Sequence, residues 1–179
     1  MNNSFIYFLF FIFFFGCDSL RSTKAENLKV HGYLINSPCK LLPGDDDINV
    51  IFNNFILKEL YENNQGWEKK EFIIVFSECD ISVINSFKIK FSGIESPTMK
   101  GFLAVDQDNL KQDVAIGIET GEGFFLPINQ FSSLIKIAKN GRNDMVFRAY
   151  LKPTKKAIDS KKIKKGNFSA KAIFTFAYN

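Results

Sequence analysis

Histidine and cysteine are the scarcest chemically active residues in this chain. Its 179 residues include one histidine, His31, and three cysteines, Cys17, Cys39 and Cys79. A Ser-His-Asp or Cys-His site needs a histidine base beside its nucleophile, so catalysis would have to be built around His31 alone. The later two cysteines are too far apart for the ligand spacing of a zinc site. We therefore expect no enzymatic activity, no cofactor and no bound metal.

Strong net charge is also lacking. Lysine and arginine number 23 against 19 aspartate and glutamate, a net charge of +4. Lysines cluster between residues 155 and 165, but no aromatic residues lie among them, so we predict a solvated loop between strands and no nucleic-acid partner. Consecutive Asp45, Asp46 and Asp47 do not have the alternate-position spacing of a calcium loop. They predict a solvated turn.

One long apolar run is present, at the beginning of the chain. Residues 5–15 are apolar apart from one tyrosine, which is too short for a membrane-spanning helix but suits the apolar region of a secretory signal. We predict that residues 1–17 are a signal peptide and that the protein is exported. Cleavage fits the small residue Gly16 before Cys17 or a later site ending at Ala25. A third possibility is lipoprotein processing, with Cys17 becoming the lipidated first residue.

Export gives the two remaining cysteines a role. In an oxidising compartment an isolated pair, Cys39 and Cys79, predicts a disulfide. It would close a loop of roughly 40 residues. The reduced entropy of the unfolded chain would then stabilise the fold by on the order of 4 kcal/mol. The alternative is two free buried thiols, as expected of a cytosolic protein.

Strand signals recur along the chain and favour an all-β fold. Residues 72–76 form a continuous apolar run, as expected of a central strand buried on both faces, whereas residues 87–91 alternate strictly between apolar and lysine. A short helix is expected within residues 55–62. Further strands are predicted at residues 28–35, 48–52, 114–118, 124–128 and 145–151. This many strands at this spacing predict a sandwich or a barrel of about 155–160 residues in one domain.

The last fourteen residues carry the strongest strand pattern. Apolar side chains occupy every second position, which places them on one face of a strand: Ala170, Ala172, Phe174, Phe176 and Tyr178. We expect this final strand to lack a neighbour on one edge. The simpler alternative is an ordinary closing strand of a β-sandwich.

These features together resemble the subunits of chaperone–usher fimbriae. The resemblance is carried by residues 32–39 (GYLINSPC), 76–79 (FSEC), 87–93 (FKIKFSG), 115–118 (AIGI), 127–129 (PIN) and 147–150 (FRAY). It is closest at the end of the chain, where Gly166 lies fourteenth from the C-terminus and Tyr178 is penultimate. Among these proteins the chain looks most like the minor subunits of type 1-like pili.

The resemblance implies an all-β fold, an incomplete immunoglobulin-like β-sandwich that lacks its last strand and is completed by donor-strand exchange. It implies that residues 18–32 form an N-terminal extension and residues 33–179 a pilin domain. Leu28 and Val30 of the extension would enter another subunit's groove, with Gly32 continuing the same face. The alternative for this segment is an ordinary first strand.

The resemblance also implies partners and a destination. The final strand, with Gly166, Ala172, Phe174, Phe176 and Tyr178, would bind a periplasmic pilus chaperone. An outer-membrane usher and neighbouring pilus subunits would follow, and the protein would pass through the periplasm to a fimbrium on the cell surface. We thus expect a structural, non-enzymatic minor subunit or adaptor that contributes to bacterial adhesion. A stand-alone secreted β-sandwich binding domain and a lipid-anchored surface protein remain the alternatives.

Overall fold

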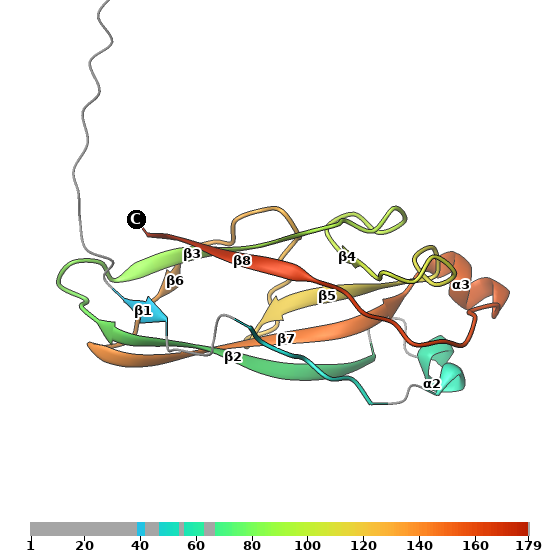
Figure 1. Ribbon diagram of the computed structural model, residues 1–179, viewed down its shortest axis with the longest axis horizontal. Coiled ribbons are helices and arrows are strands. Elements are labelled where there is room, and N and C mark those ends of the chain that lie inside the picture. Colours follow the sequence, from blue (N-terminus) through green and yellow to red (C-terminus); the bar gives the residue numbers. More distant parts are fainter. Residues whose placement is uncertain (1–38, 42–46, 54–55, 63–66, 179) are drawn as a thin grey trace, which may run out of the picture. The chain divides into compact units, whose positions relative to one another are not determined.

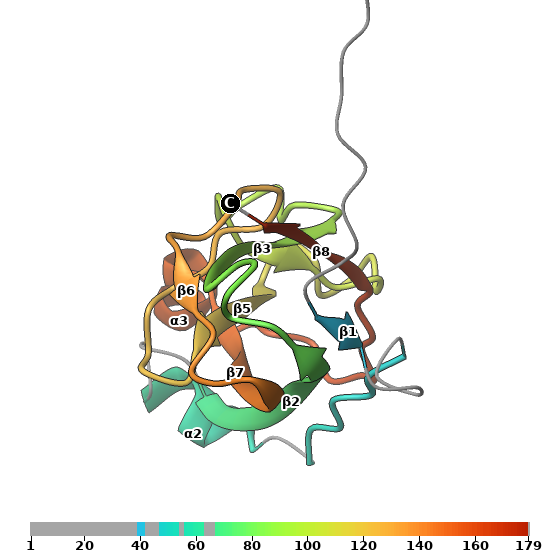
Figure 2. The ribbon, with the colours of Figure 1, turned by 90° about the vertical axis from the view of Figure 1, so that its left-hand side faces the viewer.

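Two antiparallel β-sheets pack against each other in the computed structural model (Figures 1 and 2). The structure describes residues 39–178 apart from 42–46, 54–55 and 63–66. These residues belong to one unit of the chain, residues 36–179. The proposed signal peptide and extension, with Leu28, Val30 and Gly32, lie outside the described residues.

The larger sheet has five strands in the order β1-β2-β7-β5-β4. They are β1 (Lys40–Leu41), β2 (Trp67–Cys79), β7 (Gly141–Pro153), β5 (Val114–Thr120) and β4 (Leu103–Ala104). The smaller sheet has three strands in the order β6-β3-β8. They are β6 (Ile135–Lys136), β3 (Ser86–Gly93) and β8 (Ala172–Tyr178).

The core lies between the sheets and is built largely from phenylalanine. The alternation predicted at residues 87–91 is confirmed, because Phe87, Ile89 and Phe91 of β3 are all buried. The Phe76 ring of β2 packs edge-to-face on Phe87 and Phe176, at centroid distances of 5.1 and 4.7 Å. Edge-to-face packing is a favourable arrangement of aromatic rings. These contacts tie the smaller sheet to the centre of the larger one.

A disulfide joins Cys39 to Cys79, as predicted. Cys39 directly precedes β1, and Cys79 is the last residue of β2. Both residues are buried. Strand β1 pairs with this end of β2, with Lys40 opposite Ser77, so the disulfide fixes the point at which the described chain enters the larger sheet.

The prediction that residues 72–76 are buried on both faces is confirmed for Val75, which is 7 % exposed on the outer face, but is wrong for Ile73. These residues form the middle of β2, and Ile74 and Phe76 are fully buried. Ile73, however, is 47 % exposed, because it lies on the outer face of the larger sheet beside Val146 of β7. The apolar run therefore reflects one buried face and an outer face that is only partly covered.

Two other predicted strands do not form. Residues 48–52 are extended but belong to neither sheet. Residues 124–128 make only an isolated bridge between Phe125 and Glu119, since Pro127 has no N–H to continue a ladder. The predicted short helix does form, as α2 (Leu57–Glu62).

The lysine-rich segment is not entirely a loop, contrary to expectation. It contains a short helix, α3 (Lys155–Ser160), between β7 and β8. The Thr154 hydroxyl accepts a hydrogen bond from the Ala157 N–H and caps the helix, and Ala157 is buried beneath it. A left-handed residue, Lys161, ends the helix. The solvated part follows α3.

Candidate functional site, an apolar groove between the sheets

Strand β8 has one free edge. It pairs with β3 along its whole length, from Phe87 opposite Tyr178 to Gly93 opposite Ala172. Among the described residues, β3 is the only strand that pairs with β8, and β8 ends the order of the smaller sheet. The backbone N–H and C=O groups on the other edge of β8 are therefore available to a further strand.

A second extended segment, residues 47–53, faces this free edge across a gap. Its side chains alternate, with Ile48, Val50 and Phe52 partly buried against the core and Ile51 79 % exposed. The alternation is that of a strand, yet the segment joins neither sheet in the part of the chain that the structure describes. We call residues 47–53 the wall segment.

An apolar groove of about 860 Å³ lies between the wall segment and the chain that leads into β8. Its second wall is formed by residues 163–170 together with Ala172 and Phe174. The floor is apolar and comes from both sheets, from α2 and from the turn before β5: Leu60, Phe72, Phe91, Leu103, Leu110, Val114, Ile116, Ile118, Ala149 and Leu151. Figure 1 shows the wall segment running from β1 towards α2 while the red chain runs from α3 into β8 in the opposite direction.

This arrangement has the chemistry of a strand-binding site. A strand placed in the groove would hydrogen-bond to the free edge of β8 and direct alternate side chains onto the apolar floor. Burying a Leu or Val side chain there would contribute roughly 1.5–3 kcal/mol each. The polar residues Asp47, Asn49 and Lys165 lie at the rim of the groove, where water remains accessible.

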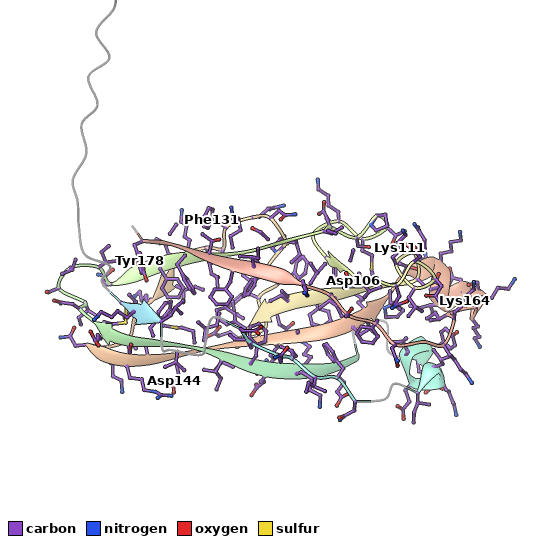
Figure 3. The ribbon with its side chains drawn as sticks, in the orientation of Figure 1. Asp106, Lys111, Phe131, Asp144, Lys164 and Tyr178 are labelled. Atoms are coloured by element: carbon purple, nitrogen blue, oxygen red, sulfur yellow. A yellow bond between two sulfur atoms is a disulfide. The ribbon has the colours of Figure 1, made fainter. Side chains whose placement is uncertain are left out.

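The structure brings most of the predicted C-terminal residues to this site. Ala172 and Phe174 line the groove, and Phe176 continues the same inward face of β8 against the core. Tyr178, labelled at the end of β8 in Figure 3, also packs against the core. The strand begins at Ala172, so Ala170, which was predicted to lie on the same strand, precedes it. Gly166 is exposed in the segment before β8, where it lines the groove. The roles assigned to these residues stay predictions.

Sequence reasoning missed the opposite wall of the groove. It expected residues 48–52 to be an ordinary paired strand, whereas Ile48, Val50 and Phe52 face the open groove instead. It also missed Phe168, which packs its ring on Phe52. The signal was present in the alternation of Asp47, Asn49 and the apolar residues between them, but pattern alone does not tell a paired strand from an unpaired one.

A polar cluster occupies the outer face of the larger sheet, opposite the groove. The Glu119 side chain is 5 % exposed, and its carboxylate accepts hydrogen bonds from the Lys69 Nζ at 2.7 and 2.9 Å. The neighbouring Tyr150 ring covers Gly117, where any side chain would collide with it. Burial, and secondarily the Glu119 carboxylate, raises the pKa of Tyr150 to about 12. These groups are paired within the fold and serve its stability.

Other kinds of site are not found in the described part of the chain. No group of three or more His, Cys, Asp and Glu side chains there is arranged to hold a metal ion. No helix among the same residues is long and apolar enough to cross a membrane.

Solved structures define the class of protein to which this fold belongs. The structure of the P pilus rod subunit PapA matches with a TM-score of 0.66 and 19 % identity, over 80 % of this chain and all of that one. A chain from the structure of a chaperone–usher pilus matches with a TM-score of 0.67 and 17 % identity, over 91 % of this chain and all of that one. The fold is thus the incomplete immunoglobulin-like sandwich of pilus subunits.

The sequence identifies the family. The profile of the family described as Fimbrial protein matches residues 28–179. An uncharacterized fimbrial-like protein of Escherichia coli K12, YfcP, is 29 % identical over 86 % of this chain and 83 % of its own length. The fimbrial-like protein FimF of Salmonella typhimurium LT2 is 26 % identical over 72 % of each chain. This chain belongs to the fimbrial protein family and is a subunit of a fimbrium.

Proposed function

We propose that this fimbrial subunit is assembled by donor-strand exchange, with the apolar groove as the acceptor. The observation that carries the proposal is the free edge of β8 beside a groove with an apolar floor. Such an edge is a liability for a protein that stays alone in solution, because it pairs with any available strand. The free edge of β8 is accounted for if the subunit receives a strand from another chain.

The first strand to occupy the groove would come from a periplasmic chaperone. Phe174 and Ala172 supply the apolar positions beside β8 that such a strand would cover. Gly166 lines the groove before β8 and, having no side chain, leaves space there for the inserted strand. Phe176 and Tyr178 continue the same inward face of the strand and would extend the contact with the chaperone. An outer-membrane usher would then receive the chaperone-bound subunit.

The second strand would come from another subunit and replace the chaperone. The corresponding donor in this chain is the extension at residues 18–32, with Leu28 and Val30 as the inserted side chains and Gly32 next on the same face. Exchange of one strand for another conserves the backbone hydrogen bonds while the side-chain fit changes. This provides a route from a soluble complex to a fibre without an input of chemical energy.

We assign the chain a structural role, without enzymatic activity, as a minor subunit or adaptor of the pilus. Residues 1–17 would direct export, after which the protein crosses the periplasm to the cell surface. The family match over residues 28–179 and the fold of pilus subunits support this assignment. Its contribution to adhesion would be to join other subunits.

Co-expression tests the proposal. The chain should accumulate as a soluble one-to-one complex when its cognate chaperone is present and should aggregate or form strand-swapped oligomers when it is absent. Size-exclusion chromatography and native mass spectrometry separate these outcomes. A stable soluble monomer without any chaperone would contradict the proposal and would favour a stand-alone secreted binding domain. An N-terminal diacylglyceryl group on Cys17, found by mass spectrometry, would identify a lipid-anchored protein instead.

A further inference from the structure

One end of the groove is strongly basic. Helix α3 and the segment after it carry six lysines with one acid, Asp159, among them: Lys155, Lys156, Lys161, Lys162, Lys164 and Lys165. All six are exposed. Lys164 and Lys165 line the groove itself, next to Ile163 and Gly166. Figure 3 places Lys164 at the α3 end of the chain's path into β8.

These lysines have no carboxylate partners within the described residues. Ion pairs form elsewhere in the fold, as between Lys111 and Asp108 at 2.6 Å, but none involves a lysine between residues 155 and 165. Of the acids near this end, Asp108 pairs with Lys111, and Asp106 accepts a hydrogen bond from the Ser169 hydroxyl at 2.9 Å. Asp159 and Glu62 lie beside Lys155 but form no ion pair with it. The six lysines outnumber the acids beside them, so this end of the groove carries a net positive charge.

The groove is electrically asymmetric as a result. The wall segment begins at Asp47, on the β1 side, and runs towards α2 at the end where the lysines lie (Figure 1). An acid thus marks the rim at one end, and Lys164 and Lys165 mark it at the other. A strand that enters the groove would meet opposite charges at its two ends, so that its own charge pattern affects both affinity and direction.

We propose that the groove selects a strand with carboxylates at the end that lies beside Lys164 and Lys165. The inference rests on the proposed function, since it names the kind of strand that the groove accepts. It also points to a chain other than a second copy of this one. The extension of this chain has two acids, Asp18 and Glu26, separated in the sequence by Arg21 and Lys24 and followed by Lys29. It therefore lacks the required block of carboxylates. The donor is thus an acidic strand from a different subunit.

Peptide exchange on the chaperone-bound mature chain tests the inference. Four fluorescent ten-residue peptides share an alternating valine–threonine centre and carry two glutamates or two lysines at the amino or the carboxyl end. Their rates of chaperone displacement are measured at about 50 mM and about 500 mM NaCl. The peptide whose two glutamates lie beside Lys164 and Lys165 should enter about five-fold faster at low salt than the peptide with two lysines at that same end. This is the effect expected for two exposed ion pairs. High salt should remove the difference.

Variants locate the effect. The double variant Lys164→Glu/Lys165→Glu should reverse the preference, whereas Lys155→Ala/Lys156→Ala, in the same lysine run but away from the groove lining, should retain it. Equal rates for acidic and basic peptides, or a preference that survives Lys164→Glu/Lys165→Glu, would overturn the inference while leaving the groove a strand acceptor. If no peptide of either charge enters, the proposed function itself fails.

Discussion

The rings of Phe52 and Phe168 contact each other, with centroids 6.0 Å apart and planes inclined at 45°. Phe52 belongs to the wall segment and Phe168 to the chain that leads into β8, and both line the groove. Their contact therefore joins the two walls at a place where an inserted strand would have to pass. The two rings therefore partly close the groove.

Removing this contact should speed strand entry. Phe52→Ala would leave the two walls without their aromatic bridge, so a donor peptide should displace the chaperone several-fold faster. Stopped-flow fluorescence with a labelled peptide measures the rate. Ile51→Ala is the matched control, because Ile51 lies next to Phe52 but is 79 % exposed on the other face of the wall segment. Equal rates for Phe52→Ala and Ile51→Ala would show that the ring contact is no barrier.

A charge on the groove face of β8 should prevent chaperone capture. Phe174→Glu would place a carboxylate among apolar side chains without a partner, which costs several kcal/mol. The amount of chaperone that co-purifies with the variant should fall to background. Ile173→Glu provides the comparison, since Ile173 is 73 % exposed on the opposite face of the same strand. The assignment of β8 fails if Phe174→Glu retains the chaperone as well as Ile173→Glu does.

Where a strand has one buried face and one solvent-exposed face, apolar and polar residues alternate in the sequence. This alternation predicted the buried faces of the strands correctly. The alternation of β3 and the inward face of β8 at Phe174 and Phe176 are both observed. The groove could not be predicted in the same way, because it arises from a strand that is missing between two segments. Residues 48–52 show a strand pattern whether or not a partner is present, and only the topology reveals that they have none in either sheet.

Local signals were overlooked at α3. Thr154 precedes Lys155, Lys156 and Ala157, which is a capping residue followed by good helix formers. The density of lysine suggested a solvated loop, yet Ala157 is buried and fixes the helix to the fold. The burial of Ala157 depends on how α3 packs against the rest of the fold, so it could not be predicted from the composition of the segment.

The extension should be needed for assembly and not for folding. Leu28→Asp would put a carboxylate into the apolar groove of the next subunit and forfeit about 1.5–3 kcal/mol of burial. The variant should still form its chaperone complex but should fail to insert into an acceptor subunit, as followed by native mass spectrometry. Lys29→Asp alters the other face of the extension and should insert normally. Normal fibre assembly by Leu28→Asp would make the extension an ordinary structural strand.

Alkaline solution should weaken the fold through Tyr150. Its pKa is raised to about 12 by burial and by Glu119, above the value of about 10 for an exposed phenol. The folded chain holds this proton more tightly than the unfolded chain, so the contribution is complete below about pH 10 and is lost as the pH rises towards 12. The loss is at most about 3 kcal/mol. Tyr150→Phe keeps the ring, so urea unfolding of this variant should depend less on pH in that range. Parallel curves for the two proteins would contradict the assignment.

The central claim, that β8 has an open edge which a donor strand completes, is tested most directly by amide hydrogen exchange in β8. The measurement labels the mature chain in a short pulse directly after its release from the chaperone, before oligomers form, with and without a donor peptide present at release. We predict rapid exchange at the amides of β8 that do not bond to β3, and at residues 47–53, until the peptide binds and protects them. Slow exchange throughout β8 without peptide, unchanged when the peptide is added, would show that the sandwich is already complete and would contradict the account.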